Sequence, residues 1–184
     1  METSNADTLL QQFNETIEKW ITNLDGYTLA MLCQQPHPGS WSLGQVYVHI
    51  IADTTYFVEQ MKAALLLDNI NSEKEMHEDA KAMFEKNAFP DMLLANPSND
   101  PNLRQPQSKD ELSQGLSCIK EEVNKLYTTT DFSTSTGKTE HPGLRFFSAL
   151  NWLQFAEMHM RHHFRQQKRI DEQLFLHKNE TKKR

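Results

Sequence analysis

The sequence has few cysteines and no long hydrophobic run. Its two cysteines, Cys33 and Cys118, are too few for the disulfide framework of a small secreted domain, and we interpret each as a small buried side chain. The first residues, METSNADTLLQQFNETIEKW, lack the basic and then apolar segments of a signal peptide. No apolar stretch approaches the roughly 20 residues that a membrane-spanning helix needs. We therefore predict a cytoplasmic protein that does not span a membrane.

Positive charge is also scarce. The 184 residues include 19 Lys and Arg against 25 Asp and Glu, which gives a formal net charge of −6 at pH 7. The one basic cluster ends the sequence, and we predict that residues 179–184 form a disordered basic tail. Without a basic stripe elsewhere, nucleic acid is not an expected partner. The length suits one domain, which we place at residues 1–178.

Glycine and proline are few, and they mostly separate segments in which apolar residues recur every three or four positions. We see no alternating run long enough for a β-sheet. A short charged helix is expected within residues 71–89, before a proline-rich connection. The periodicity predicts an all-α protein, a four-helix bundle with a long crossover between its second and third helices. The four long helices are expected at about 6–33, 43–67, 108–129 and 143–175.

Two of these helices begin with a capping-box pattern. Ser42 is followed by Gln45, and Ser108 is followed by Glu111. In such a box each side chain accepts a hydrogen bond from the backbone N–H of the other residue, so two free donors at the helix start are satisfied.

The second helix is apolar over most of its circumference, yet Gln45, His49 and Asp53 recur on one face at i, i+4 and i+8. A buried polar group without a partner costs about 1–3 kcal/mol. Three such groups in line therefore need a compensating interaction. A core histidine with a hydrogen-bond partner is the simpler interpretation of His49 taken alone.

The fourth helix contains three histidines within five residues, in the segment MHMRHHF. His159 and His163 lie one turn apart on one face, whereas Glu157 and Arg161 point away and are expected in solvent or in a surface pair. Imidazoles at i and i+4 can bind one metal ion, and a third from a facing helix completes the pocket while leaving coordination positions open. Solvated surface histidines are the alternative.

Two motifs together resemble the DinB/YfiT-like superfamily of metal-binding four-helix bundles. They are WSLGQVYVHIIAD at 41–53 and HMRHHFRQ at 159–166. The segment HPGLRFFSALNW, which precedes the last helix, is also similar to YfiT-type members. The resemblance implies that His49, His159 and His163 bind one divalent metal ion and that His162 stays outside the ligand set. All-imidazole ligation suits zinc or nickel, the main candidates, and also copper or iron.

The resemblance further implies a metal-dependent enzyme that transfers a low-molecular-weight thiol, of the bacillithiol type, to a small-molecule substrate. A metal-dependent hydrolase and a non-catalytic, stress-related metal-binding protein are the alternatives, and a homodimer is plausible. Asp53 is the candidate general base, with a surface carboxylate as the alternative. Four further side chains are candidates for the pocket or for hydrogen bonds to the site, with a structural role as the alternative for each: Gln45, Tyr56, Trp152 and Gln166. The histidines expected only to be solvated are His37, His77, His141 and His177.

Overall fold

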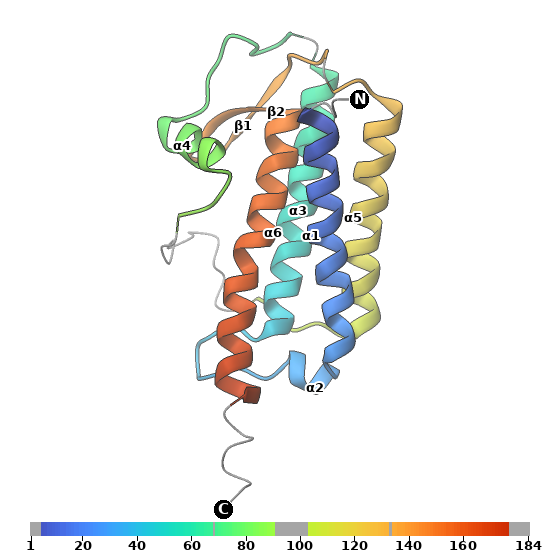
Figure 1. Ribbon diagram of the computed structural model, residues 1–184, viewed down its shortest axis with the longest axis vertical. Helices are drawn as coiled ribbons and strands as arrows, with labels where there is room; N and C mark the ends of the chain where they lie inside the picture. The colour runs from blue at the N-terminus through green and yellow to red at the C-terminus, as the bar shows by residue number, and fades with distance from the viewer. Residues whose placement is uncertain (1–4, 68, 91–102, 133, 177–184) are drawn as a thin grey trace, which may run out of the picture.

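Four long helices form the body of the protein in a computed structural model that describes residues 5–67, 69–90, 103–132 and 134–176 (Figure 1). They are α1 (Asn5–Asn23), α3 (Leu43–Leu66), α5 (Lys109–Thr129) and α6 (Ala149–Asp171). Helices α1 and α3 each pack against both α5 and α6, so the four helices surround one core. The all-α bundle with a long crossover between its second and third long helices is confirmed.

The first helix is shorter than predicted. Helix α1 ends at Asn23, and a 3-10 turn, η1 (Leu24–Gly26), and the short helix α2 (Leu29–Leu32) follow it. Between them Tyr27 is extended, with φ −125° and ψ 144°, and the Thr28 side chain accepts a hydrogen bond from the backbone N–H of Met31. A side chain that caps a new helix in this way competes with continuation of the old one. The apolar periodicity runs through this break and does not reveal it.

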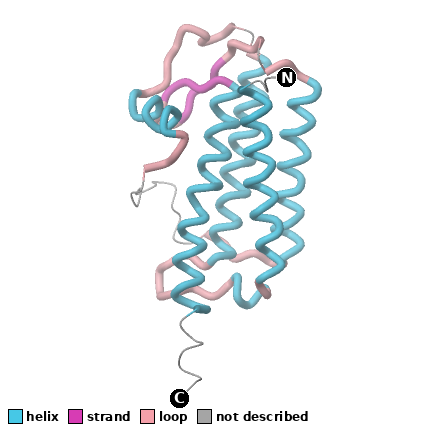
Figure 2. Tube along the Cα trace, in the orientation of Figure 1, coloured by secondary structure: helices cyan, strands magenta, loops and turns pink. Residues whose placement is uncertain are grey.

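A β-hairpin precedes the last helix, so the prediction of no sheet and of a helix from residue 143 is wrong. Strands β1 (Lys138–His141) and β2 (Arg145–Ser148) are antiparallel, with Lys138 opposite Ser148. Gly143, with φ 91°, lies in the turn between them. Figure 2 shows that this hairpin lies at one end of the helical bundle, close to α4 (Glu78–Lys86), the short charged helix that the sequence predicts.

Aromatic side chains fill the core where α1, α3 and α6 meet. Trp20 is fully buried, its ring stacks on Phe164 at 4.6 Å, and it meets the edge of Tyr47 at 4.9 Å. The polar atoms are satisfied, since Trp20 donates to the backbone oxygen of Met160 and Tyr47 donates to that of Trp20. Burial of each such side chain contributes about 2–3 kcal/mol. These contacts hold α6 in place against α1 and α3.

Capping boxes determine where two of the long helices begin. Both halves of the Ser42–Gln45 box are present in α3, and Ser148 and Asn151 form a second complete box at the start of α6. The predicted box at Ser108 is only half formed, because the Glu111 side chain accepts from the backbone N–H of Gln107 instead. The two helices that carry the histidines therefore have sharply defined first turns.

The two cysteines differ in their exposure to solvent. Cys118 is exposed and Cys33 is half-buried, so the prediction that Cys118 is buried is wrong. Among the described residues, no helix combines the length and hydrophobicity needed to cross a bilayer. The basic tail at 179–184 lies outside the described residues.

Candidate metal centre

The three predicted ligands meet between α3 and α6. His49 comes from α3, and His159 and His163 come from α6; their exposed fractions are 5%, 7% and 8%. The Nε2 atoms of His159 and His163 are 3.2 Å apart, and one ring nitrogen from each of the three side chains lies within 4.8 Å of the others. The structure therefore brings all three residues to one point that could hold a metal ion.

The spacing of the two α6 nitrogens fits a shared ion. A tetrahedral ion with bonds of about 2.0–2.1 Å separates its ligand nitrogens by about 3.3 Å, close to the 3.2 Å between His159 and His163. The Nδ1–H of His163 donates to Oε1 of Gln166 at 2.9 Å, which leaves the lone pair of His163 on Nε2, the atom that faces His159. The donor set thus fits a divalent cation that accepts imidazole nitrogen.

Burial keeps the three histidines neutral near pH 7. It lowers the pKa of His49 to about 4 and that of His163 to about 3, and it lowers the pKa of His159 well below its ordinary value. Loss of hydration is the largest cause for each, because the charged imidazolium loses more than the neutral ring. Neutral imidazole is the form that binds a metal, so protons compete weakly for these nitrogens at neutral pH.

Asp53 is the carboxylate beside the triad. Its Oδ1 is 3.5 Å from Nδ1 of His49, and its Oδ2 is 3.6 Å from Nε2 of His159. Because both rings are neutral near pH 7, these contacts are not ion pairs. Burial raises the pKa of Asp53 to about 6. With 30% of its side chain exposed, Asp53 connects the buried nitrogens to solvent.

The two predicted glutamines have different surroundings. Gln166 contacts His163 directly, as the hydrogen bond above shows. Gln45 instead completes the α3 capping box, and its Nε2 donates to the backbone oxygen of Leu103. Both polar atoms of the Gln45 side chain are therefore engaged at the helix start, and the triad receives no hydrogen bond from it.

Aromatic rings surround the histidines. The ring of Trp41 lies 5.1 Å from that of His49, and the rings of Phe57 and Phe89 lie 5.5 and 6.0 Å from that of His159. Sequence reasoning missed both phenylalanines, although Phe57 follows Asp53 by one turn on the same face of α3.

Two predicted pocket residues lie beyond Phe57. Trp152 is buried, stacks on Phe57 at 5.6 Å and donates to the hydroxyl of Thr139, while the exposed Tyr56 meets the edge of Trp152. Phe57 therefore lies between Trp152 and His159. In this arrangement Trp152 and Tyr56 support the aromatic wall that Phe57 presents to the triad.

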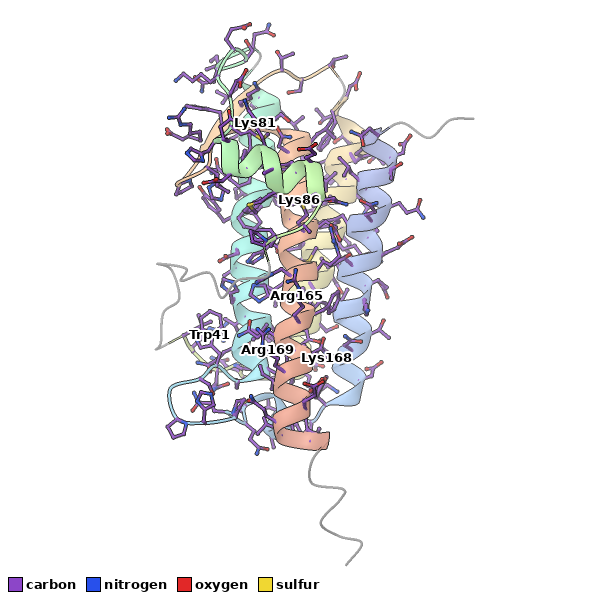
Figure 3. All side chains as sticks on the ribbon, turned by 60° about the vertical axis from the view of Figure 1, so that its left-hand side comes forward. Trp41, Lys81, Lys86, Arg165, Lys168 and Arg169 are labelled. Carbon is purple, nitrogen blue, oxygen red and sulfur yellow. The ribbon has the colours of Figure 1, made fainter. Side chains whose placement is uncertain are left out.

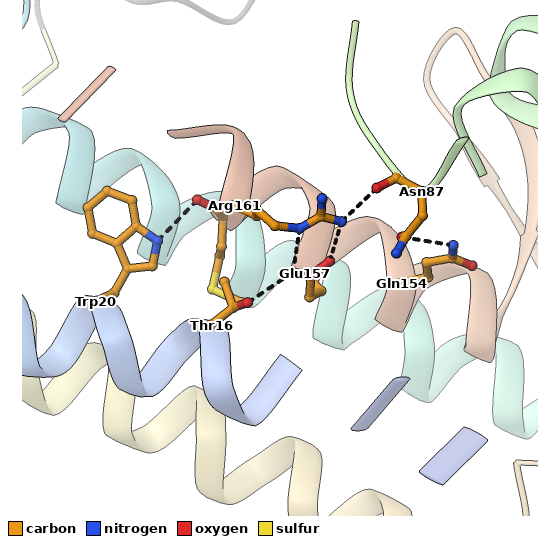
Figure 4. A network of polar contacts seen from close by, with 7 residues as sticks. Thr16, Trp20, Asn87, Gln154, Glu157 and Arg161 are labelled. Carbon is orange, nitrogen blue, oxygen red and sulfur yellow. Dashed lines mark hydrogen bonds and ion pairs between the residues drawn. The ribbon is translucent and has the colours of Figure 1, made fainter. Parts of the chain in front are cut away.

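A second polar cluster lies on the side of α6 that faces α1 and α4 (Figure 4). Glu157 is only 3% exposed, and it accepts two hydrogen bonds from Arg161 and one from Thr16 on α1. The prediction that Glu157 and Arg161 face solvent or form a surface pair is therefore wrong for Glu157. Arg161 also donates to the backbone oxygen of Asn87, the residue that ends α4.

These contacts position the segment that follows α4. Gln154 donates to the Asn87 side chain and Arg165 donates to the backbone oxygen of Phe89. The Phe89 ring is thereby held 5.1 Å from Phe155 and against His159. Side chains of α6 thus fix one aromatic wall of the histidine site.

The remaining histidines do not join the triad. His162 lies beside Phe89, with its ring 5.4 Å away. His141, expected in solvent, is half-buried and stacks on Trp152 at 5.4 Å, so that prediction is wrong. His77 caps α4 through Nδ1, which accepts from the backbone N–H of Asp79. His37 is exposed, and His177 lies outside the described residues.

Comparison with known proteins identifies the family. The sequence model of the DinB superfamily matches residues 10–167, which include both histidine motifs. The chain belongs to the DinB superfamily. No curated protein matches this DinB-superfamily sequence.

A solved structure shares the fold. The comparison structure is described as "YfiT from Bacillus subtilis is a probable metal-dependent hydrolase with an unusual four-helix bundle topology". It aligns with a TM-score of 0.63 and 15% sequence identity, covering 95% of this DinB-superfamily chain and 90% of that chain. At this identity the likeness establishes the fold, and the residues of this chain must carry any argument about its chemistry.

Proposed function

We propose that this protein is a metal-dependent enzyme that binds one divalent ion through His49, His159 and His163 and transfers a low-molecular-weight thiol to an electrophilic small molecule. The observation that carries the proposal is the convergence of three buried, neutral imidazoles from two helices. Three neutral ligands leave coordination positions open and do not cancel the charge of the ion. When bound, the ion would supply positive charge that favours the ionised form of a thiol and polarises an electrophile.

Asp53 is suited to accept the proton of the thiol. Its pKa of about 6 leaves it ionised near pH 7, and an adjacent cation favours the carboxylate further. Proton transfer to Asp53 leaves a thiolate, whose sulfur forms a bond to the electrophilic carbon as the leaving group departs with its electron pair. The exposed part of Asp53 then returns the proton to solvent or to the leaving group. Gln166 holds the His163 ring with Nε2 toward the site.

Hydrolysis is the second candidate, and the same Asp53 contact favours it. A carboxylate beside two imidazoles can equally accept a proton from water that attacks an ester or amide. The description of YfiT as "a probable metal-dependent hydrolase" agrees with this candidate. The two reactions differ in the nucleophile that is consumed, so an assay can separate them.

Metal analysis tests the first part of the proposal. Purified protein is expected to contain about one divalent ion per chain, and His49→Ala and His163→Ala should lose it. His162→Ala is the matched control, since it removes the neighbouring histidine that does not join the triad, and it should keep the ion. Full occupancy in the His49 and His163 variants would end the metal hypothesis.

Turnover tests the second part. With a small electrophile and a panel of low-molecular-weight thiols, the metal-loaded protein should consume thiol, and Asp53→Asn should be slower by about 10²–10⁴-fold while it keeps its metal. Turnover of esters without a thiol would favour the hydrolase. Stoichiometric metal without turnover of any substrate would instead favour the non-catalytic metal-binding protein.

A further inference from the structure

The part of α6 that follows His159 carries four cations, although the chain as a whole has a net charge of −6. Three of them have partners within the protein: Arg161 binds Glu157, Arg165 donates to the backbone oxygen of Phe89, and Lys168 lies 3.9 Å from Glu172. The fourth, Arg169, is exposed, and within the described part of the chain it forms no ion pair.

Arg169 lies at the edge of the histidine site. It follows Gln166 by three residues and His163 by six, and side chains on a helix lean toward its N-terminus, so the guanidinium reaches back toward Gln166. Figure 3 shows Arg169 and Trp41 projecting on the same side of the bundle, where the Trp41 ring packs on His49.

With a divalent ion bound, the side chains around the site would carry an excess of positive charge. Imidazole ligands carry no charge, so a divalent ion held by the three histidines would keep its double positive charge, and Arg169 lies on the same side of the bundle. Among the described residues, Asp53 is the one carboxylate that contacts the triad. A guanidinium on the same side of the bundle is repelled by such an ion unless an anionic group lies between them.

We propose that Arg169 binds an anionic group, a carboxylate, sulfonate or phosphate, of the small molecule that reacts at the metal centre. This inference rests on the proposed function, because it assumes an ion at His49, His159 and His163. The planar guanidinium can donate two parallel hydrogen bonds to such an oxyanion, and Trp41 offers a flat apolar surface beside it. The substrate class is therefore a small molecule with a negative group next to its thiol or electrophilic centre.

Cobalt-loaded protein provides a test that does not depend on turnover. Each ω-mercaptocarboxylate of three to six carbons is titrated against the mercaptoalcohol of the same length, and binding is followed by the sulfur-to-cobalt absorption band. For the chain length that binds most tightly, the wild-type protein should bind the mercaptocarboxylate more tightly than the mercaptoalcohol. Arg169→Gln should lower this ratio of affinities about tenfold. The matched control, Lys168→Gln, removes a neighbouring exposed cation and should leave the ratio unchanged. Higher salt should reduce the preference, since it screens exposed charges.

The outcomes separate this proposal from the proposed function. If cobalt binds but Arg169→Gln and wild type show the same ratio, the role of Arg169 is overturned and the metal centre stands. If cobalt binds and no thiol changes its spectrum, the Arg169 proposal is likewise overturned. If wild-type protein binds no cobalt, nickel or zinc, both proposals fail together.

Discussion

Two clusters of buried polar side chains lie on different sides of α6, and they are built in opposite ways. On one side, the Glu157 carboxylate is surrounded by donors from Arg161 and Thr16 at 2.8–2.9 Å. On the other, the nitrogens of His159 and His163 approach each other at 3.2 Å. Nδ1 of His159 is buried without a hydrogen-bond partner in the described part of the chain. In the first cluster the carboxylate receives its hydrogen bonds from the protein itself, whereas in the second the ring nitrogens face one shared position.

The difference separates a structural cluster from a candidate functional one. A buried carboxylate is tolerated when a cation and further donors satisfy it, and the result joins α6 to α1 and to the end of α4. At the triad, the Nε2 lone pair of His163 is directed at His159, and among the described residues the Nδ1 of His159 has no hydrogen-bond partner. The Glu157–Arg161 cluster therefore stabilises the scaffold, and the triad is available for a ligand.

Acid should affect the triad strongly in the metal-free protein. The unfolded chain takes up protons on its histidines near pH 6.5, whereas the folded chain does so on His49 only near pH 4 and on His163 only near pH 3. The free energy of unfolding therefore falls as pH decreases from 7.5 to 5, by about 2 kcal/mol for each of these two residues, and His159 acts in the same direction.

Protonation of Asp53 changes the free energy of unfolding in the opposite direction. Its pKa is about 6 in the folded chain against an ordinary value of 3.8, so protonation in this range favours the folded state and offsets about 1 kcal/mol. From His49, His163 and Asp53 we expect a net loss of about 3 kcal/mol between pH 7.5 and 5, to which His159 adds a further loss; urea unfolding at each pH measures it. His163→Gln should lose about 2 kcal/mol less than wild type over the same range. Equal stability at both pH values would contradict the triad's neutral state.

Removing Arg161 tests the structural cluster. Arg161→Ala leaves the buried Glu157 carboxylate with Thr16 as its remaining described donor, and it should lower the free energy of unfolding by about 2 kcal/mol. The double variant Glu157→Met/Arg161→Met removes both charges and should restore most of that loss. A cost below about 0.5 kcal/mol for Arg161→Ala is the result expected of a surface pair and would remove the contrast between the two clusters.

The smallest expected effect concerns Gln166, which acts on the site through His163. Gln166→Ala removes the acceptor for Nδ1–H of His163 and should weaken metal binding about tenfold, with little change in stability. Gln166→Glu keeps an acceptor at this place and should retain the affinity of the wild type. Metal affinity measured by competition with a chelator distinguishes the two variants, and an equal loss in both would show that Gln166 does not act by orienting His163.

Much of the fold followed from helical periodicity, because the long helices each bury one continuous stripe. The hairpin did not, since its strands have four residues each and owe their position to distant contacts. The Lys138 ammonium donates to the backbone oxygens of Ser72 and Lys74, and Phe147 is buried in the core. A sequence pattern within so short a segment cannot report such contacts.

Spacing predicts that His159 and His163 share one helix face and that Asp53 shares a face with His49, because residues one turn apart are neighbours. The full set of three ligands is implied by the family resemblance. Phe57 follows the same spacing, one turn beyond Asp53, so the sequence does carry a signal for it. Phe89 carries no such signal, because Arg165 and the end of α4 place it. The surface prediction for Glu157 is wrong because a helical projection gives direction only, and the partner Thr16 belongs to a helix far away in sequence.

Ser148 is both the last residue of β2 and the N-cap of α6, so no spare residue separates strand from helix. One residue inserted between this junction and His159 would turn the following part of α6 by about 100°. Such a turn would carry both α6 imidazoles away from His49 without altering a single ligand. Insertions and deletions should therefore be tolerated in evolution only in the loops outside the N-caps of the two histidine-bearing helices. An engineered insertion at the hairpin–helix junction should abolish the site even where the bundle still folds.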